Sequence, residues 1–257
     1  RVRNINSKSP ARFNSDKRRL YESSGCAGKL AVLAVRLDTF PKPKEQKVFF
    51  VGTNDPSALT TIRKKILTQL NHLPDMGEYI HRSYFDGADK YCKDTFILIK
   101  YFGTSFLPRL LKMKRQIDYL SKKISYIPSK ISDKSLQCMS NFIPDHLPPR
   151  IREYRKRFEH YLLLQASDKC IEEIENLLST EIENNKEIDF FKCTKSEGED
   201  VLLHRYVAGS APTRFAIINS SESGELLPLD VALPRNCESW HDIFPKEITD
   251  KMVQFFQ

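Results

Sequence analysis

Short apolar runs separated by polar stretches recur along this chain and predict the strands of a largely buried sheet. The clearest runs are residues 48–53, 78–82, 160–165 and 188–193. Residues 214–220 and 226–233 predict two further strands near the end of the chain. Most of these runs hold only five or six residues, a usual strand length in globular proteins.

Apolar residues at helical spacing fill the intervals between the predicted strands. A helix is predicted at residues 54–70, started by Asn54 or Asp55 together with Pro56, and Ser167 and Asp168 are predicted to cap a second helix. Ser196 and Glu199 match a capping box and predict a third helix. The alternation predicts an α+β fold in which an antiparallel sheet of ferredoxin-like units is backed by helices.

A strongly basic segment interrupts this pattern. Residues 100–157 hold 14 Lys and Arg and 4 Asp and Glu, a net charge of +10, whereas the whole chain has +8. Large apolar residues alternate with the cations, and prolines at positions 108, 128, 144, 148 and 149 divide the segment into short pieces. Cations beside apolar side chains are typical of helices that lie on an anionic membrane. We therefore expect a mainly helical insertion that binds membranes.

Eleven cations of this segment are the expected membrane contacts. They are Arg109, Lys112, Lys114, Arg115, Lys122, Lys123, Arg150, Arg152, Arg155, Lys156 and Arg157.

Other features of the sequence exclude several classes of protein. No apolar run approaches the ~20 residues of a membrane-spanning helix, and the first residues are polar and basic, unlike a signal peptide. The six cysteines are widely spaced without a Cys-x-x-Cys pair, which predicts reduced thiols rather than a zinc site or a disulfide framework. The chain begins without methionine, and we expect it to be a fragment.

A turn of small residues precedes the first apolar run. Gly25 and Gly28 are followed directly by residues 30–35, which predict a buried strand. Glycine allows close approach of a backbone or a flat ligand, as a dinucleotide site requires. By spacing alone, an ordinary turn remains the alternative.

Longer sequence segments around this turn and elsewhere in the chain resemble the bacterial respiratory D-lactate dehydrogenases, which are FAD-dependent, quinone-linked, peripheral membrane enzymes. The matching segments are residues 1–3, 9–14, 21–32, 34–40, 77–82, 93–96, 146–150 and 203–205. The resemblance covers essentially the whole chain. It implies oxidation of D-lactate or related 2-hydroxy acids to pyruvate or its analogue, with electrons passing through FAD to a membrane quinone. It also implies an anionic phospholipid partner at the cytoplasmic side of the inner membrane.

The same resemblance implies a division into three parts. Residues 1–40 would close an FAD-binding domain, in which Gly25, Gly28 and Val32 contact the cofactor. Residues 41–82 and 158–257 would form a substrate-binding cap, and residues 83–157 the membrane-binding insertion. The family's pyrophosphate loop would precede residue 1, and its C-terminal histidines would follow Gln257, so we expect little activity from the chain alone.

Oxidation of a hydroxy acid needs an arginine fork for the carboxylate and a base for the hydroxyl proton. Two His-Arg pairs and two single arginines could supply these groups: His81, Arg82, His204, Arg205, Arg214 and Arg235. For each of them, an ion pair or hydrogen bond within the cap is the structural alternative. We find no metal-ligand spacing, no P-loop and no Ser/His/Asp order.

Two other functions remain open from the sequence. A basic isoelectric point with clustered cations also fits a non-enzymatic module that binds nucleic acid or an acidic partner. The segment holds no recognisable nucleic-acid motif, and its large aliphatic residues suit acyl chains better than bases. A purely structural interaction domain, whose arginines form scaffold ion pairs, is the third possibility.

Overall fold

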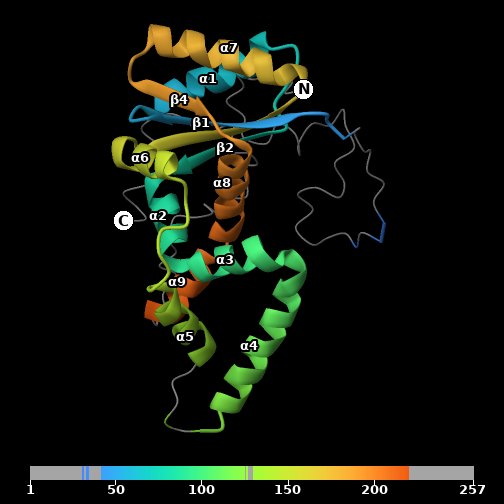
Figure 1. Ribbon diagram of the computed structural model, residues 1–257, viewed down its shortest axis with the longest axis vertical. Coiled ribbons are helices and arrows are strands. Elements are labelled where there is room, and N and C mark those ends of the chain that lie inside the picture. Colours follow the sequence, from blue (N-terminus) through green and yellow to red (C-terminus); the bar gives the residue numbers. More distant parts are fainter. Residues whose placement is uncertain (1–30, 32, 35–41, 125, 127–129, 220–257) are drawn as a thin grey trace.

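A computed structural model describes residues 31, 33, 34, 42–124, 126 and 130–219 of the chain. Within them lies one four-stranded antiparallel sheet in the order β2-β3-β1-β4 (Figure 1). Its strands are β1 (Gln46–Thr53), β2 (Met76–His81), β3 (His160–Ser167) and β4 (Ile188–Lys192). The helix α1 (Pro56–Gln69) follows β1, and α7 (Lys169–Asn184) precedes β4. This split βαβ arrangement confirms the predicted ferredoxin-like, α+β architecture.

Side chains of β1 point alternately into two apolar layers, as the two-residue period of a strand requires. Phe49 and Val51 pack with Ile62 of α1 and Ile174 of α7, and all four side chains are fully buried. Phe50 points to the other layer and stacks on Tyr161 at a ring distance of 5.2 Å. The sheet is therefore covered on both faces.

The second face is covered by an insertion between β2 and β3 and by a helix that follows β4. The inserted elements are α2 (Arg82–Tyr91), α3 (Lys93–Phe102), the 3-10 turn η1 (Thr104–Phe106), α4 (Leu107–Ser121), α5 (Ile131–Ser140) and α6 (Pro149–Arg157). The later helices are α8 (Lys195–Ala208) and α9 (Ala211–Asn219). Phe85, Phe96 and Ile151 anchor α2, α3 and α6 in the core.

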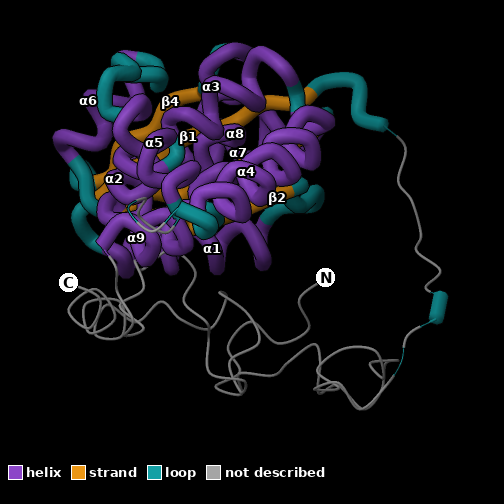
Figure 2. The backbone as a smooth tube through the Cα atoms, turned by 90° about the horizontal axis from the view of Figure 1, so that it is seen from below, coloured by secondary structure: helices purple, strands orange, loops and turns teal. Residues whose placement is uncertain are grey.

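The helix α4 extends away from the sheet, and α5 packs against α4 (Figure 1). Seen from below, α4 and α5 lie in front of the strands (Figure 2). We call residues 107–124, which comprise α4 and its C-terminal turn, the arm.

Two local predictions were wrong. The capping box of α8 is formed by Thr194 and Glu197, not by Ser196 and Glu199, because the chain turns two residues earlier, where the Cys193 N–H bonds to Val48. Residues 214–219 lie in α9 rather than in a strand, and α9 contacts α5 and α2. The predicted strand at residues 226–233 lies outside the described residues.

Asp168 occupies the N-cap position before α7, as predicted, but its side chain makes no capping hydrogen bond to the helix. Its carboxylate instead accepts hydrogen bonds from the backbone N–H groups of Lys44 and Glu45, at 3.0 and 3.1 Å. The residue thus fixes the approach to β1.

Replacing Gly52 with alanine is expected to destabilise the sheet. A Cβ at this position of β1 would lie 2.4 Å from the Phe158 ring, which is itself buried. Overpacking of this kind costs about 1–3 kcal/mol, so the urea midpoint should fall. Gly209→Ala is the matched control, because the nearest atom to its Cβ would be 3.9 Å away. Equal midpoints for the two variants would contradict the close packing.

Candidate functional site

Two histidines lie side by side at the end of the β2–β3 strand pair. His81 and His160 are cross-strand partners, and their ring centroids lie 5.1 Å apart. The Tyr79 hydroxyl is 2.6 Å from Nδ1 of His160. His160 is buried and His81 is half-buried. The strand register therefore brings a buried imidazole, a more accessible imidazole and a phenol together.

The start of α2 sets the proton position on His81. Nδ1 of His81 accepts a hydrogen bond from the Ser83 backbone N–H at 3.1 Å, so the neutral ring carries its proton on Nε2. Ligand atoms of His81, Glu159 and His160 lie within 4.8 Å of one another, a spacing compatible with a metal ion. Binding a metal through Nε2 of His81 would require Nδ1 to take up the proton and lose its bond to the Ser83 N–H. The cluster therefore fits hydrogen bonding and proton transfer better than metal binding.

Arg82 lies at the same strand end and forms an ion pair with Glu159. Its side chain is 34% exposed and that of Glu159 is 49% exposed. Both groups can therefore exchange this partner for a ligand at small cost, because exposed ion pairs contribute only about 0–1 kcal/mol.

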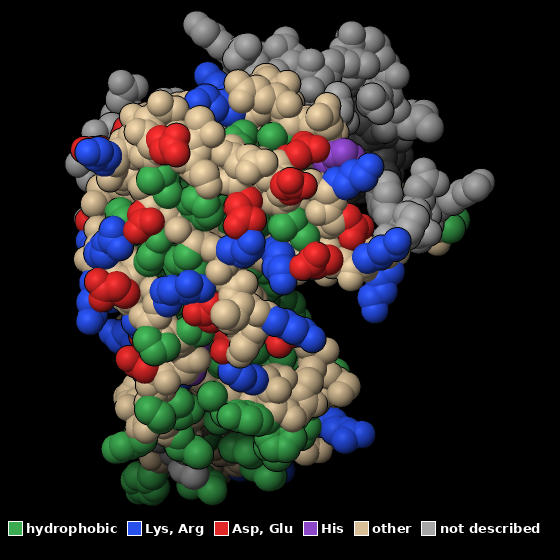
Figure 3. All heavy atoms as spheres, turned by 45° about the horizontal axis from the view of Figure 1, so that its top comes forward, with side chains coloured by type: hydrophobic (Ala, Val, Ile, Leu, Met, Phe, Trp, Pro, Cys, Tyr) green, Lys and Arg blue, Asp and Glu red, His purple; other side chains and the backbone are tan. Residues whose placement is uncertain are grey.

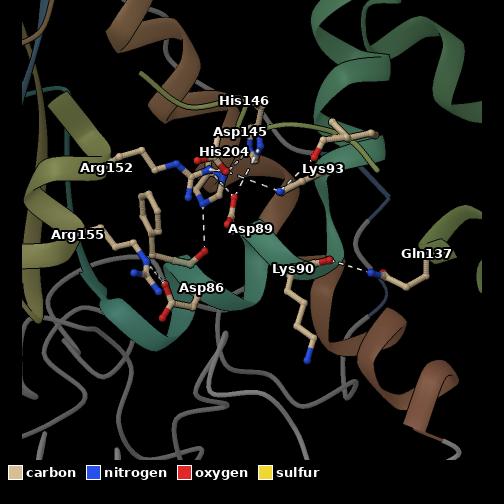
Figure 4. A network of polar contacts seen from close by, with 12 residues as sticks. Asp86, Asp89, Lys90, Lys93, Gln137, Asp145, His146, Arg152, Arg155 and His204 are labelled. Carbon is tan, nitrogen blue, oxygen red and sulfur yellow. Dashed lines mark hydrogen bonds and ion pairs between the residues drawn. The ribbon is translucent and has the colours of Figure 1, made fainter. Parts of the chain in front are cut away.

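His204 has a different environment from His81. It is 2% exposed, and its ring lies between the Phe85 carbonyl and His146 (Figure 4). Nε2 of His204 donates to the carbonyl at 3.3 Å, so its Nδ1 accepts a hydrogen bond from Nε2 of His146 at 3.2 Å. This chain of bonds gives His204 a structural position.

Burial keeps both rings neutral. It lowers the pKa of His204 from 6.5 to about 3, and that of His146 from 6.5 to about 4 despite the opposing effect of nearby Asp89. Arg152 binds Asp89 at 2.7 Å in the same network. The network joins α2 and α6 of the insertion to α8 (Figure 4).

The remaining predicted catalytic residues do not converge with His81 and Arg82. Arg205 is paired with Glu78. Arg214 is buried on α9, where it donates to Asp94 at 3.0 Å and lies 3.3 Å from Asp133. Arg235 and the predicted FAD contacts Gly25, Gly28 and Val32 lie outside the described residues.

The cations of the arm are the second notable feature. Five exposed ones have no carboxylate within ion-pair distance among the described residues: Arg109, Lys112, Arg115, Lys122 and Lys123. Exposed apolar side chains lie among them: Leu111, Met113, Ile117, Tyr119, Leu120 and Ile124. Hydrophobic side chains gather over this end of the molecule (Figure 3).

Most cations of α6 and one of the arm are already paired within the protein. Arg150, Arg152, Arg155 and Arg157 bind Glu197, Asp89, Asp86 and Asp189, respectively, and Lys114 binds Asp133. Of the eleven predicted membrane contacts, the five on the arm and Lys156 keep an uncompensated charge among the described residues. None of the described helices combines the length and apolarity needed to cross a bilayer.

Residues 48–257 match the family model described as D-lactate dehydrogenase, membrane binding. The chain belongs to this family. It is 46% identical over 252 residues to a quinone-dependent D-lactate dehydrogenase of Haemophilus influenzae, and 43% identical over 253 residues to one of Escherichia coli. A relative of the same name from Corynebacterium glutamicum is 40% identical over 247 residues. These matches cover 95–98% of this chain but only 43–45% of each relative, so the chain spans less than half of their length.

The membrane-binding family model covers the described sheet as well as the insertion, since its match begins within β1. The strand-end cluster therefore lies within the residues that this family model matches. Sequence reasoning found His81 and Arg82 but missed His160, Tyr79 and Glu159. The available signal was the histidine that opens the predicted strand at residue 160, and only the β2–β3 register shows that it meets His81.

Proposed function

We propose that this chain is part of a quinone-dependent D-lactate dehydrogenase that uses FAD and attaches to the membrane surface. Three relatives carry this name, and the chain matches them over nearly its whole length. In this proposal D-lactate or a related 2-hydroxy acid is oxidised, and a membrane quinone takes the electrons. The comparisons give no support to the alternative of a nucleic-acid module.

The uncompensated charge of the arm is the observation that carries the membrane part of the proposal. Its five cations, which have no carboxylate partner among the described residues, lie among six exposed apolar side chains of the arm, which extends from the body. Anionic phospholipids attract such cations, while the apolar side chains enter the boundary between headgroups and acyl chains. We place this surface against the cytoplasmic side of the inner membrane, as a peripheral attachment.

The division into parts follows the same proposal. Residues 1–40 close the FAD domain, residues 41–82 and 158–257 form the cap, and residues 83–157 form the membrane-binding insertion. The structure supports the insertion boundary, because the chain leaves the sheet after β2 at His81 and returns with β3 at His160.

The strand-end cluster is the proposed substrate site. Arg82 leaves Glu159 and binds the lactate carboxylate with its planar fork. His160, whose Nδ1 can donate to the Tyr79 hydroxyl, takes the hydroxyl proton on its other ring nitrogen. His81, which carries its proton on Nε2, donates a hydrogen bond to the substrate from the neighbouring strand. We propose that Gly25, Gly28 and Val32, which lie outside the described residues, would contact FAD, and that FAD when bound would supply the hydride acceptor.

Arg82→Lys in the full-length enzyme is expected to lower kcat/KM for D-lactate about tenfold to a hundredfold, the equivalent of a lost charge-assisted hydrogen bond of about 1.5–3 kcal/mol. The ammonium group keeps the charge and can still pair with Glu159, but it cannot grip two carboxylate oxygens. The melting temperature should change little, because the ion pair is exposed.

Arg155→Lys is the matched control for this variant, because Arg155 also pairs with one partly exposed carboxylate, that of Asp86. Its kcat/KM should stay near wild type. If Arg82→Lys retains full kcat/KM, or loses stability instead of activity, Arg82 is a scaffold residue and not the carboxylate ligand.

A further inference from the structure

A cavity of about 360 Å³ lies at the root of the arm, between α3, α4, α5, α8 and α9. Its apolar wall is made by Ile99, Leu107, Leu110, Leu111 and Leu136. Leu111 belongs both to this wall and to the exposed apolar side chains of the arm. The cavity is thus continuous with the surface that the proposed function places against the membrane.

Lys114, Asp133 and Arg214 line the polar side of the cavity, and Asp94, which pairs with Arg214, completes a group of four charges. Lys114 binds Asp133, and Arg214 binds both Asp133 and Asp94. The two carboxylates and the guanidinium are buried, and the Lys114 side chain is 18% exposed. Two positive and two negative charges cancel, while the N–H groups of Lys114 and Arg214 outnumber the bonds they make to the carboxylates.

This charge balance discriminates between ligands. A phosphate or a fatty-acid carboxylate would add an uncompensated negative charge beside Asp133, which is costly in a partly desolvated site. A plain acyl chain would contact the leucines but would make no hydrogen bond to the N–H groups of Lys114 and Arg214 that the carboxylates do not use. A neutral flat ring with carbonyl oxygens meets both requirements, because it contacts the leucines and accepts hydrogen bonds from the cationic side chains.

We propose that this cavity binds the head ring of a membrane quinone. The proposal rests on the proposed function, which supplies the quinone and the membrane. The volume lies within the range of roughly 300–1,000 Å³ that is usual for small-molecule sites. Because Leu111 both lines the cavity and lies on the proposed membrane surface, a quinone could reach the cavity from the bilayer.

The test uses the full-length enzyme with a short-chain benzoquinone in vesicle-free solution, and a hydrophilic dye as the alternative electron acceptor. Thr213→Trp places a large ring at the partly open side of the cavity, on exposed Thr213. Thr180→Trp makes the same change on the exposed face of α7, far from the cavity in sequence and fold. We expect Thr213→Trp to raise the quinone KM about tenfold, equivalent to about 1.4 kcal/mol. Dye reduction and the KM for D-lactate should stay near wild type in both variants.

An unchanged quinone KM in folded Thr213→Trp would overturn the proposal, as would a loss of dye reduction equal to the loss of quinone reduction.

If Thr213→Trp fails to fold, photolabelling of the wild-type enzyme with an azido-benzoquinone tests the site instead. Labels on residues 95–136 and 206–214 support the site, and labels confined to other peptides exclude it. Displacement of the label by oleate but not by the benzoquinone would instead identify an acyl-chain pocket. Absence of lactate-dependent dye reduction in the wild type would contradict the proposed function, whereas the label position would still test the cavity.

Discussion

Replacing the five unpaired cations of the arm with glutamine is expected to weaken binding to anionic vesicles by about a thousandfold or more. These residues are Arg109, Lys112, Arg115, Lys122 and Lys123. Each Lys or Arg near an anionic surface contributes about 1 kcal/mol, so five contribute on the order of 5 kcal/mol. The fold should be retained, because all five side chains are exposed and none pairs with a carboxylate among the described residues.

The matched control removes the same number of charges from the sheet end of the molecule. The glutamine substitutions are placed at five exposed lysines outside the insertion: Lys44, Lys64, Lys169, Lys186 and Lys195. Vesicle co-sedimentation should show binding close to wild type for this control. Screening shortens from ~10 Å at 0.1 M salt to ~3 Å at 1 M, so wild-type binding should also weaken strongly over that range. Equal losses in both charge variants would mean that net charge, and not the arm, directs the attachment.

The second large effect is a loss of stability in mild acid. His146 and His204 have pKa values of about 4 and about 3 in the folded protein, against 6.5 for a solvated histidine. Below pH 6.5 the unfolded chain therefore takes up protons that the folded chain excludes, and the free energy of unfolding falls. Each ring contributes about 1.4 kcal/mol per pH unit, so the two rings lower stability by about 4 kcal/mol between pH 7 and 5.

Urea unfolding at several pH values measures this slope directly. His204→Gln and His146→Gln should each reduce the slope between pH 6.5 and 5 by about half, whatever their effect on stability at pH 7. The charged groups that face the pair are Asp89, Lys93, Asp145 and Arg152. A slope that survives in both variants would show that other groups cause the acid sensitivity.

Periodicity predicted the sheet well because each strand is short, apolar and bounded by turns. The spacing of apolar residues also located α1 and α7. It failed at residues 214–219, where an apolar run of helical length cannot be told from a strand by pattern alone. The contacts of α9 with α2 and α5 decide the conformation, and they join residues more than 70 positions apart.

The candidate site was only partly predictable, since both of its features depend on tertiary contacts. His160 meets His81 through a strand register that spans 79 positions of the chain. Likewise, the sequence identifies eleven cations as membrane contacts, but it does not show which of them form ion pairs with carboxylates of the protein. Asp86 and Asp89 neutralise Arg155 and Arg152 from α2, and this leaves the excess charge on the arm.

The central claim, that the arm meets the membrane, is tested most directly by an environment-sensitive fluorophore on Met113, a half-exposed arm residue. The label is attached through Met113→Cys in a background where Cys26, Cys138 and Cys237 are serine, and Thr180→Cys on α7 is the control. On adding anionic vesicles, the label at position 113 should brighten and shift to shorter wavelength, while the label at position 180 should not respond. A response at position 180, or silence at position 113 while the protein is vesicle-bound, would contradict the account.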